Sequence, residues 1–240
     1  MKQRLDRLLV ERGLAESREK AQALIMAGDV LVNGQKALKP GHNIDTASRV
    51  AITGKAPYVS RGGIKLAAAL DEFDIKVAGR VCLDVGSSTG GFTDCLLQRG
   101  ASRVHAVDVG AGQLDWKLRN DARVVVHEGM NARNLRFEDI GEFVDLATFD
   151  VSFISVTLIL PAAAPILRPE GCMVILIKPQ FEVGKGQVGK GGIVRSPELH
   201  RTACDRVESA AKRLGFETSI MESPITGAEG NQEFLLYARH

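Results

Sequence analysis

The 240-residue sequence predicts an α/β fold, with a Rossmann-like and mostly parallel sheet preceded by a small α+β domain. Short apolar runs alternate with helical patterns over most of the chain, which is typical of a parallel sheet covered by helices on both faces. A glycine-rich turn follows one of these runs, as at the ligand site of a doubly wound sheet. Residues 1–60 hold ten Lys or Arg and six Asp or Glu, whereas residues 61–240 hold 21 and 23, so the positive charge is concentrated in the N-terminal quarter.

The composition is that of an ordinary globular protein, with 45% hydrophobic and 25% charged residues. No apolar run reaches membrane-spanning length, because Pro161 and Pro165 interrupt the longest one, and the N-terminus has no apolar signal region. The four cysteines form no C-x-x-C pair, and Cys82 and Cys95 fall in apolar segments, so we expect buried thiols and no zinc site. These observations predict a cytoplasmic protein that binds no metal and does not insert into a membrane.

The first fifty residues predict two short helices followed by a small sheet. Apolar residues recur at helical spacing from Leu5 to Gly13, and again from Ser17 to Gly28. The dipeptide Asn33-Gly34 between two apolar runs is a strong signal for a hairpin. The helices carry basic side chains at Arg4, Arg7, Arg12, Arg18 and Lys20.

Together these features resemble the S4 RNA-binding domain. The matching pattern is Arg4-Leu5-Asp6, Gly13, Ser17-Arg18, Ala21 and Gly28-x-Val30-x-Val32-Asn33-Gly34. The resemblance implies an RNA-binding face lined by Arg4, Arg7, Arg18 and Lys20, whose charges attract phosphates of any sequence. The alternative is that these charges only solvate helix faces. We expect residues 1–57 to form this domain with its linker, near residues 53–57, and residues 58–240 to form the second domain.

The second domain is organised around one strand, turn and helix. The apolar strand Val81–Val85 is followed by Gly86, Gly90 and Gly91, and glycines there allow a sharp turn and a close approach of a ligand to the backbone. Their spacing matches neither the dinucleotide fingerprint nor the phosphate-binding loop. Asp108 ends the next strand, where a carboxylate can accept both hydroxyls of a ribose. A nucleoside cofactor without a pyrophosphate, S-adenosylmethionine, fits this pattern best, and the alternative is a purely structural turn.

Charged residues also stand directly after apolar strands, where ligands gather in a parallel sheet. Asp150 and Lys178 follow two such strands, a position that costs desolvation unless the charges have partners. Lys65 lies in the first turn of a predicted helix, where a cation opposes the helix dipole, and Glu233 begins the last strand. The alternatives for these two are an exposed surface lysine and an exposed edge glutamate. The glycine-rich stretch 184–190 lacks the Ser or Thr of a phosphate loop and is expected to be a flexible basic loop near the substrate.

In their order along the chain, these segments resemble the TlyA-type ribosomal-RNA 2′-O-methyltransferases, in which an S4 domain precedes an FtsJ-like methyltransferase domain. The resemblance covers essentially the whole chain and is most specific at a Lys-Asp-Lys-Glu tetrad, here Lys65, Asp150, Lys178 and Glu233. It implies a methyltransferase sheet with one antiparallel closing strand, S-adenosylmethionine as the cofactor, and ribosomal RNA or a ribosomal subunit as the partner. It also implies that Arg61 contacts RNA and that the cofactor is contacted by Asp84, Gly86, Ser88, Gly90, Gly91, Phe92, Asp108, Asn131 and Asp150. Relatives often carry an acid at the position of Asn131, and some have been called haemolysins.

The chemistry explains these residue types. A ribose 2′-hydroxyl is a poor nucleophile until a base removes its proton, and a lysine is such a base only when a nearby ammonium and partial burial lower its pKa. We expect Lys178 to be the base, Lys65 to hold the ribose, Asp150 to orient Lys178, and Glu233 to fix Lys65; the two lysines could also exchange roles. The alternatives are a base methyltransferase, although Val151 and Ser152 replace the prolines expected of one, and a non-catalytic RNA-binding or ribosome-assembly factor. Nothing in the sequence indicates the oligomeric state.

Overall fold

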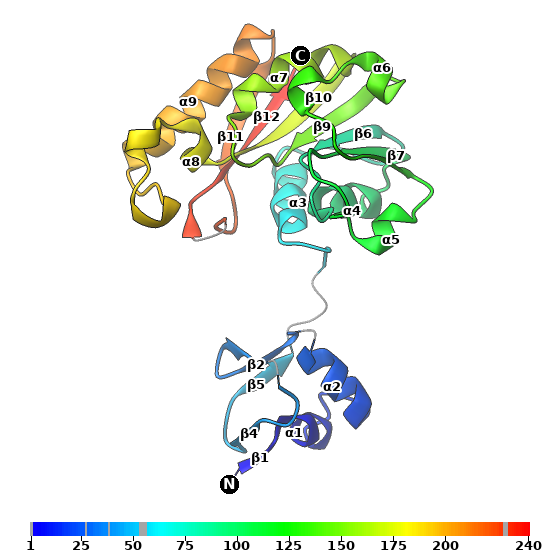
Figure 1. Ribbon diagram of the computed structural model, residues 1–240, viewed down its shortest axis with the longest axis vertical. Helices are drawn as coiled ribbons and strands as arrows, with labels where there is room; N and C mark the ends of the chain where they lie inside the picture. Colours follow the sequence, from blue (N-terminus) through cyan, green and yellow to red (C-terminus); the bar gives the residue numbers. More distant parts are fainter. Residues whose placement is uncertain (1, 27, 38, 53–56, 228–229) are drawn as a thin grey trace. The chain divides into compact units, whose positions relative to one another are not determined.

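The computed structural model describes residues 2–26, 28–37, 39–52, 57–227 and 230–240. The chain divides into two compact units, Met1–Pro57 and Tyr58–His240, which are described separately below (Figure 1). The predicted linker falls at the boundary between them, and its residues 53–56 lie outside the described residues.

The N-terminal unit contains two helices and two small sheets. The helices α1 (Leu5–Glu11) and α2 (Arg18–Met26) confirm the two predicted from apolar spacing. Positive φ angles of 50° at Asn33 and 82° at Gly34 make the predicted tight turn between two strands. The strands are β1 (Lys2–Arg4), β2 (Val30–Val32), β3 (Gln35–Lys36), β4 (Asn43–Asp45) and β5 (Val50–Ile52), paired as β1-β4 and β3-β2-β5. The core is a cluster of buried side chains that includes Leu5, Leu9, Ala21, Ile25 and Val30.

The C-terminal unit is built on a seven-stranded sheet in the order β11-β12-β10-β9-β6-β7-β8. Its strands are β6 (Val81–Val85), β7 (Arg103–Val107), β8 (Val124–His127), β9 (Val144–Phe149), β10 (Leu167–Ile177), β11 (Glu217–Glu222) and β12 (Phe234–Arg239). The pairs from β10 to β8 are parallel, and β12 is antiparallel to both of its neighbours. This arrangement confirms the predicted mostly parallel sheet with one antiparallel closing strand.

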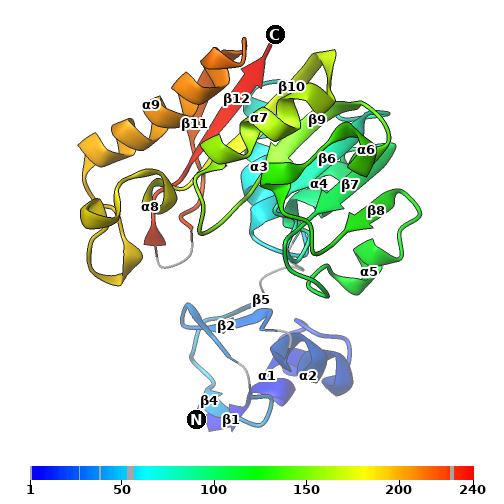
Figure 2. The same cartoon turned by 45° about the horizontal axis from the view of Figure 1, so that its top comes forward.

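Helices cover both faces of this sheet (Figure 2). One apolar layer packs the sheet against α3 and α4 and includes Leu66, Cys82 and Leu96, whereas the opposite layer packs it against α7 and α9. The helices are α3 (Gly62–Glu72), α4 (Gly91–Gln98), α5 (Trp116–Arg119), α6 (Phe137–Ile140), α7 (Leu160–Ala163), α8 (Pro179–Glu182) and α9 (Pro197–Arg213). Across the described ranges, no helix is both long enough and apolar enough to cross a membrane.

The strand order brings distant parts of the chain to one edge of the sheet. The carboxyl ends of β6, β7, β9 and β10 all lie there, because these strands are parallel. The antiparallel β12 begins at the same edge, since its first residue, Phe234, pairs with Ile177, the last residue of β10. Residues that follow the parallel strands and the residue that precedes β12 therefore meet at this edge.

Candidate active site

The first cavity at this edge has a volume of about 490 Å³, within the usual range for a small-molecule site. It lies beyond the ends of β6, β7 and β9 and is lined by five of the predicted cofactor residues, Gly86, Ser88, Asp108, Asn131 and Asp150. We call it the cofactor cavity.

The glycine turn after β6 is held close to the strand ends beside it. Gly86 has a φ of 84°, and a β-carbon there would lie 2.6 Å from the carbonyl oxygen of Asp150, so a side chain would force β6 and β9 apart. The carboxylate of Asp108 accepts hydrogen bonds from the backbone N–H of Ser88 (2.8 Å) and of Gly110 (2.7 Å). These two hydrogen bonds fix the Asp108 carboxylate in the wall of the cofactor cavity.

Four other predicted cofactor residues, Asp84, Gly90, Gly91 and Phe92, do not line this cavity. Asp84 is fully buried inside the sheet and accepts hydrogen bonds from the hydroxyls of Thr93 (2.6 Å) and Thr148 (3.1 Å), and its burial raises its pKa to about 7. A β-carbon at Gly90 would meet a leucine side chain, and one at Gly91 would meet the start of α3. Asp84, Gly90 and Gly91 support the turn from behind, and the cofactor contacts expected of these four residues stay predictions.

Asn131 lines the cofactor cavity, but its side-chain oxygen accepts a hydrogen bond from the backbone N–H of Arg133 (3.2 Å). This bond begins a short 3₁₀ turn, Ala132–Asn134. The amide oxygen of Asn131 is therefore partly used within the turn. Its N–H₂ group remains available to donate a hydrogen bond to a ligand.

The second cavity, of about 450 Å³, is lined by all four members of the predicted tetrad, Lys65, Asp150, Lys178 and Glu233. Lys65 comes from α3, Asp150 and Lys178 follow β9 and β10, and Glu233 directly precedes β12. Other lining residues include Ser152, Gln180 and Asn231. We call this the tetrad cavity.

The four charged side chains form two ion pairs. Lys178 Nζ lies 2.6 Å from Asp150 Oδ1 and donates a hydrogen bond to the hydroxyl of Ser152 at 2.8 Å. Lys65 pairs with Glu233, and both side chains are buried, with 7% and 2% of their surface exposed. The alternatives of a surface lysine and an exposed edge glutamate are thus wrong for these two residues.

Glycines shape the backbone around both ion pairs. A β-carbon at Gly227 would lie 2.1 Å from Glu233 Oε1, so only glycine leaves room for the buried carboxylate. Gly62, at the start of α3, passes the carboxylate of Asp150, where a β-carbon would lie 3.4 Å from Oδ2. The Gly-Gly pair opening α3 was visible in the sequence, whereas Gly227 carries no local signal.

The two cavities adjoin at Asp150. Asp150, Ser152 and Phe153 line both of them. Ligands bound in the two cavities would therefore be neighbours at Asp150. The loop of residues 184–192 also reaches the tetrad cavity, through Val188 and Gly192, and forms two short 3₁₀ turns.

Three residues in this region were missed by the sequence interpretation. Phe153 has a φ of 66° and 92% of its surface exposed, and its ring lies 5.3 Å from that of Phe181. Gln180 lines the tetrad cavity. Glu182 is buried and accepts hydrogen bonds from Ser155 Oγ (2.5 Å) and Val156 N (2.8 Å), and its burial raises its pKa.

Glu182 joins the two loops that carry one of the ion pairs. It belongs to the short helix α8 that follows Lys178, and its hydrogen-bond donors belong to the loop that follows Asp150. In the sequence, Glu182 is only an acidic residue four positions after Lys178. By itself this spacing indicates a charged residue on the exposed face of a helix.

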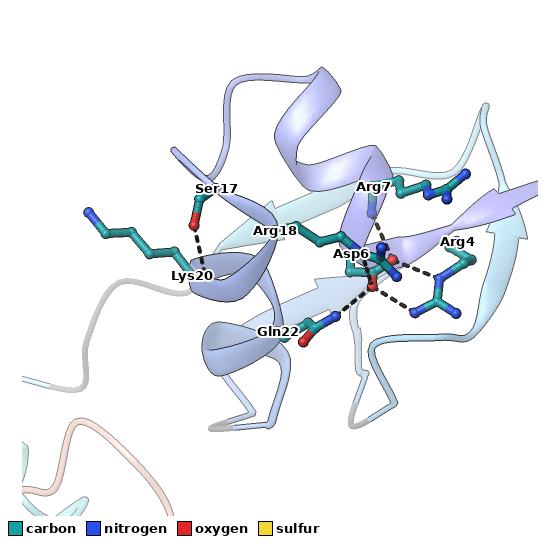
Figure 3. A network of polar contacts seen from close by, with 7 residues as sticks. All are labelled: Arg4, Asp6, Arg7, Ser17, Arg18, Lys20 and Gln22. Atoms are coloured by element: carbon teal, nitrogen blue, oxygen red, sulfur yellow. Dashed lines mark hydrogen bonds and ion pairs between the residues drawn. The ribbon is translucent and has the colours of Figure 1, made fainter.

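The N-terminal unit has a polar network of its own, centred on Asp6 (Figure 3). The fully buried carboxylate of Asp6 accepts hydrogen bonds from Arg4 (2.7 and 3.0 Å), Arg18 (3.0 Å) and Gln22 (3.0 Å), and these donors hold its pKa far below its usual range. Through these bonds Arg4 and Arg18 stabilise the fold. Their side chains remain 40% and 44% exposed, so they also present positive charge to the solvent.

The other predicted RNA contacts are less engaged with the protein. The guanidinium group of Arg7 forms no ion pair or hydrogen bond with any residue that the structure describes, and it points away from Asp6 (Figure 3). Lys20 pairs with Glu16, four residues before it, and both side chains are largely exposed. In the C-terminal unit, Arg61 donates a hydrogen bond to the carbonyl oxygen of Thr226.

The described parts of the chain contain no cluster of three or more His, Cys, Asp or Glu side chains that could hold a metal ion. All four cysteines are free thiols; Cys82, Cys95 and Cys172 are buried, and burial raises the pKa of Cys95 to about 12.

Comparisons with known proteins match both units. Residues 58–240 match the FtsJ-like methyltransferase family, and residues 3–50 match the S4 domain. The chain is 50% identical over 239 residues to the 16S/23S rRNA (cytidine-2′-O)-methyltransferase TlyA of Mycobacterium tuberculosis, an alignment that covers 98% of this chain and 89% of the relative.

Solved structures agree with these matches. A protein from Streptococcus thermophilus named as a hemolysin is 46% identical with a TM-score of 0.77, covering 99% of this chain and 88% of its own. An O-methyltransferase from Bacillus cereus in complex with S-adenosylhomocysteine superposes with a TM-score of 0.54 at 18% identity, covering 78% of this chain and 84% of its own, which shows a shared fold. The C-terminal unit thus has the fold of the S-adenosylmethionine-dependent methyltransferases.

Proposed function

Since this chain belongs to the TlyA-type family of FtsJ-like methyltransferases, we propose that it methylates the ribose 2′-hydroxyl of a cytidine in structured ribosomal RNA. S-adenosylmethionine is the cofactor of its fold. The observation that carries the proposal is the position of Asp150, which lines both the cofactor cavity and the tetrad cavity and pairs with Lys178 at 2.6 Å. A methyl donor in one cavity and a ribose in the other would meet there.

The residues of the cofactor cavity fit a nucleoside ligand. The Asp108 carboxylate, fixed by two backbone N–H groups, is placed to accept the ribose hydroxyls, and the close turn at Gly86 leaves the backbone open to a ligand. Asn131 would contact the adenine edge through its N–H₂ group. When bound, S-adenosylmethionine supplies an electrophilic methyl group attached to a positively charged sulfur.

The tetrad supplies the groups that the ribose needs. Lys178, as the neutral amine, would take the proton of the 2′-hydroxyl, whose oxygen would accept the methyl group that bound S-adenosylmethionine supplies. Lys65, buried and paired with Glu233, stabilises the negative charge that develops on the oxygen. Lys178 is the better placed base, because its partner Asp150 borders the cofactor cavity, which neither Lys65 nor Glu233 lines.

Positioning accounts for much of the rate enhancement in such a displacement, since the oxygen, methyl carbon and sulfur must be in line. Ser152 and Asp150 hold the Lys178 side-chain nitrogen from two sides, and Glu182 ties their loop to the helix that follows Lys178. The exposed ring of Phe153 offers a stacking surface for the base of the target nucleotide.

The N-terminal unit would hold the RNA. It matches the S4 domain and presents Arg4, Arg7, Arg18 and Lys20, which attract phosphates independently of sequence. Structured RNA is recognised largely by shape and by 2′-hydroxyl contacts, which suits a small basic module in the same chain as a catalytic domain. A ribosomal substrate would place the protein in the cytoplasm.

The proposal is tested by incubating the protein with ribosomal subunits and isotopically labelled S-adenosylmethionine, then mapping the label by nuclease digestion and mass spectrometry. We expect the label on the 2′-oxygen of one or a few cytidines. A label on a base atom would support a base methyltransferase instead, and RNA binding without any transfer would support a non-catalytic ribosome-assembly factor.

A further inference from the structure

One side chain that lines the tetrad cavity carries a buried polar atom without a hydrogen-bond partner among the described residues. The side-chain oxygen of Gln180, Oε1, is shielded from solvent and accepts no hydrogen bond from any residue that the structure describes. A carbonyl oxygen in this state has lost its water without gaining a donor, which is unfavourable and uncommon in folded proteins. Gln180 also lines the cavity, so a donor brought by the substrate can satisfy it after rotation about the last bond of its side chain.

Three side-chain nitrogens that line the cavity have other partners. Lys178 donates to Ser152 and pairs with Asp150, and Lys65 pairs with Glu233. The N–H₂ group of Asn231 donates to the carbonyl oxygen of Gly192 at 2.9 Å. Gln180 Oε1 is thus open to a donor that the substrate brings into the cavity.

The chemistry of an internal RNA nucleotide identifies that donor. Its 3′ and 5′ oxygens are esterified to phosphate, so the sugar carries a single hydroxyl, and the proton of that hydroxyl leaves with Lys178 in the proposed reaction. The remaining strong donors are the N–H groups of the base. In cytosine this donor is the exocyclic amino group on carbon 4.

We propose that Gln180 selects the target base by accepting a hydrogen bond from the amino group of cytosine through Oε1. This inference rests on the proposed function and names the part of the substrate that the tetrad cavity recognises. Gln180 lies two residues after Lys178, at the start of α8, so one short segment carries both the proposed base and the group that recognises the nucleotide. Recognition of the nucleotide and placement of the ribose would then be coupled through the backbone.

The test removes the two ends of this hydrogen bond separately. Ribosomal RNA is prepared by splint ligation with either cytidine or pyrimidin-2-one riboside at the mapped target position; the second nucleoside lacks only the amino group and keeps the same ribose. Both RNAs are assayed for methyl transfer with the full-length wild type and with Gln180→Leu and Gln180→Glu. Binding of S-adenosylmethionine is measured for each variant as a check on folding, because Gln180 does not line the cofactor cavity.

For the wild type, we expect kcat/KM to fall about 10- to 100-fold when the amino group is removed, since a buried acceptor is left unpaired. Gln180→Leu should lose a similar factor on cytidine RNA and nothing further on the analogue. Gln180→Glu keeps an acceptor and should stay sensitive to the amino group.

The inference is overturned if Gln180→Leu binds S-adenosylmethionine normally and still discriminates between the two RNAs as the wild type does. A wild type that methylates both RNAs equally well overturns it too. If the wild type methylates no ribose in cytidine RNA, the proposed function itself fails, which is a distinct result.

Discussion

Replacing Glu233 with glutamine should destabilise the C-terminal unit strongly, because it removes the charge partner of a buried ammonium. Lys65 is 7% exposed and Glu233 2% exposed, so the variant leaves a cation away from water with only a neutral amide beside it. Breaking a buried ion pair from one side costs about 3–5 kcal/mol. For a unit of this size, that corresponds to a fall in Tm of roughly 6–20 °C.

The assay is thermal unfolding of the full chain, followed through the transition that added S-adenosylmethionine shifts upward, since this ligand binds the folded C-terminal unit. The double variant Lys65→Met, Glu233→Leu removes both charges and should recover most of the stability without recovering methyl transfer. Asp74→Asn is the matched control, because it breaks an ion pair whose side chains are 78% and 82% exposed. A loss below about 1 kcal/mol in Glu233→Gln would show that the Lys65 ammonium is not held by this carboxylate.

Three further predictions concern other parts of the chain. Arg7→Ala should weaken RNA binding and lower the salt dependence of binding by about one released counterion, at unchanged Tm. Arg4→Ala should also lower the Tm of the N-terminal unit, because it deprives Asp6 of a hydrogen-bond partner. Salt titrations of RNA binding and calorimetry distinguish the two variants. Burial raises the pKa of Asp84 to about 7, so the folded state keeps a proton that the unfolded chain releases near pH 4. The protonated Asp84 therefore contributes its full stability below pH 4, and this contribution declines as the pH rises to 7. Denaturant titrations should show a flatter pH profile over that window in Asp84→Asn, and an unchanged slope would contradict the assignment. Gly91→Ala would place a β-carbon within 3.0 Å of a backbone nitrogen in α3 and should lower the Tm of the C-terminal unit, whereas Gly186→Ala, with open space around it, should not.

Most of the fold could be predicted from the sequence, because strands, helices and turns are indicated by residues that are close together in the chain. The alternation of apolar strands and helical patterns predicted the parallel sheet, and the Asn33-Gly34 dipeptide predicted its hairpin. The short strands β1, β4 and β5 were missed, since three residues with mixed burial show no clear alternation. Their pairing depends on partners far away along the chain.

The site was predictable to the extent that strand order could be inferred. Asp150 and Lys178 follow strands that proved to be neighbours, so their proximity follows from a parallel sheet. The burial of Glu233 could not be foreseen from local sequence, because it depends on the antiparallel placement of β12 and on space left by Gly227.

The surroundings of Asp84 could not be foreseen from the sequence either. The family resemblance implies a cofactor contact for Asp84, which stays a prediction; in the structure its side chain is buried and accepts hydrogen bonds from Thr93 and Thr148. The unpaired oxygen of Gln180 likewise has no counterpart in a residue pattern, since it depends on the three-dimensional placement of every nearby donor.

The most direct measurement of the central claim is single-turnover methyl transfer by Lys178→Ala, with S-adenosylmethionine and ribosomal RNA both bound at saturation. If Lys178 takes the proton of the 2′-hydroxyl where the two cavities meet, both ligands should bind the variant as they bind the wild type, and the transfer rate should fall by at least about 100-fold, the usual contribution of a general base. A variant that binds both ligands and transfers the methyl group at the wild-type rate would contradict the account.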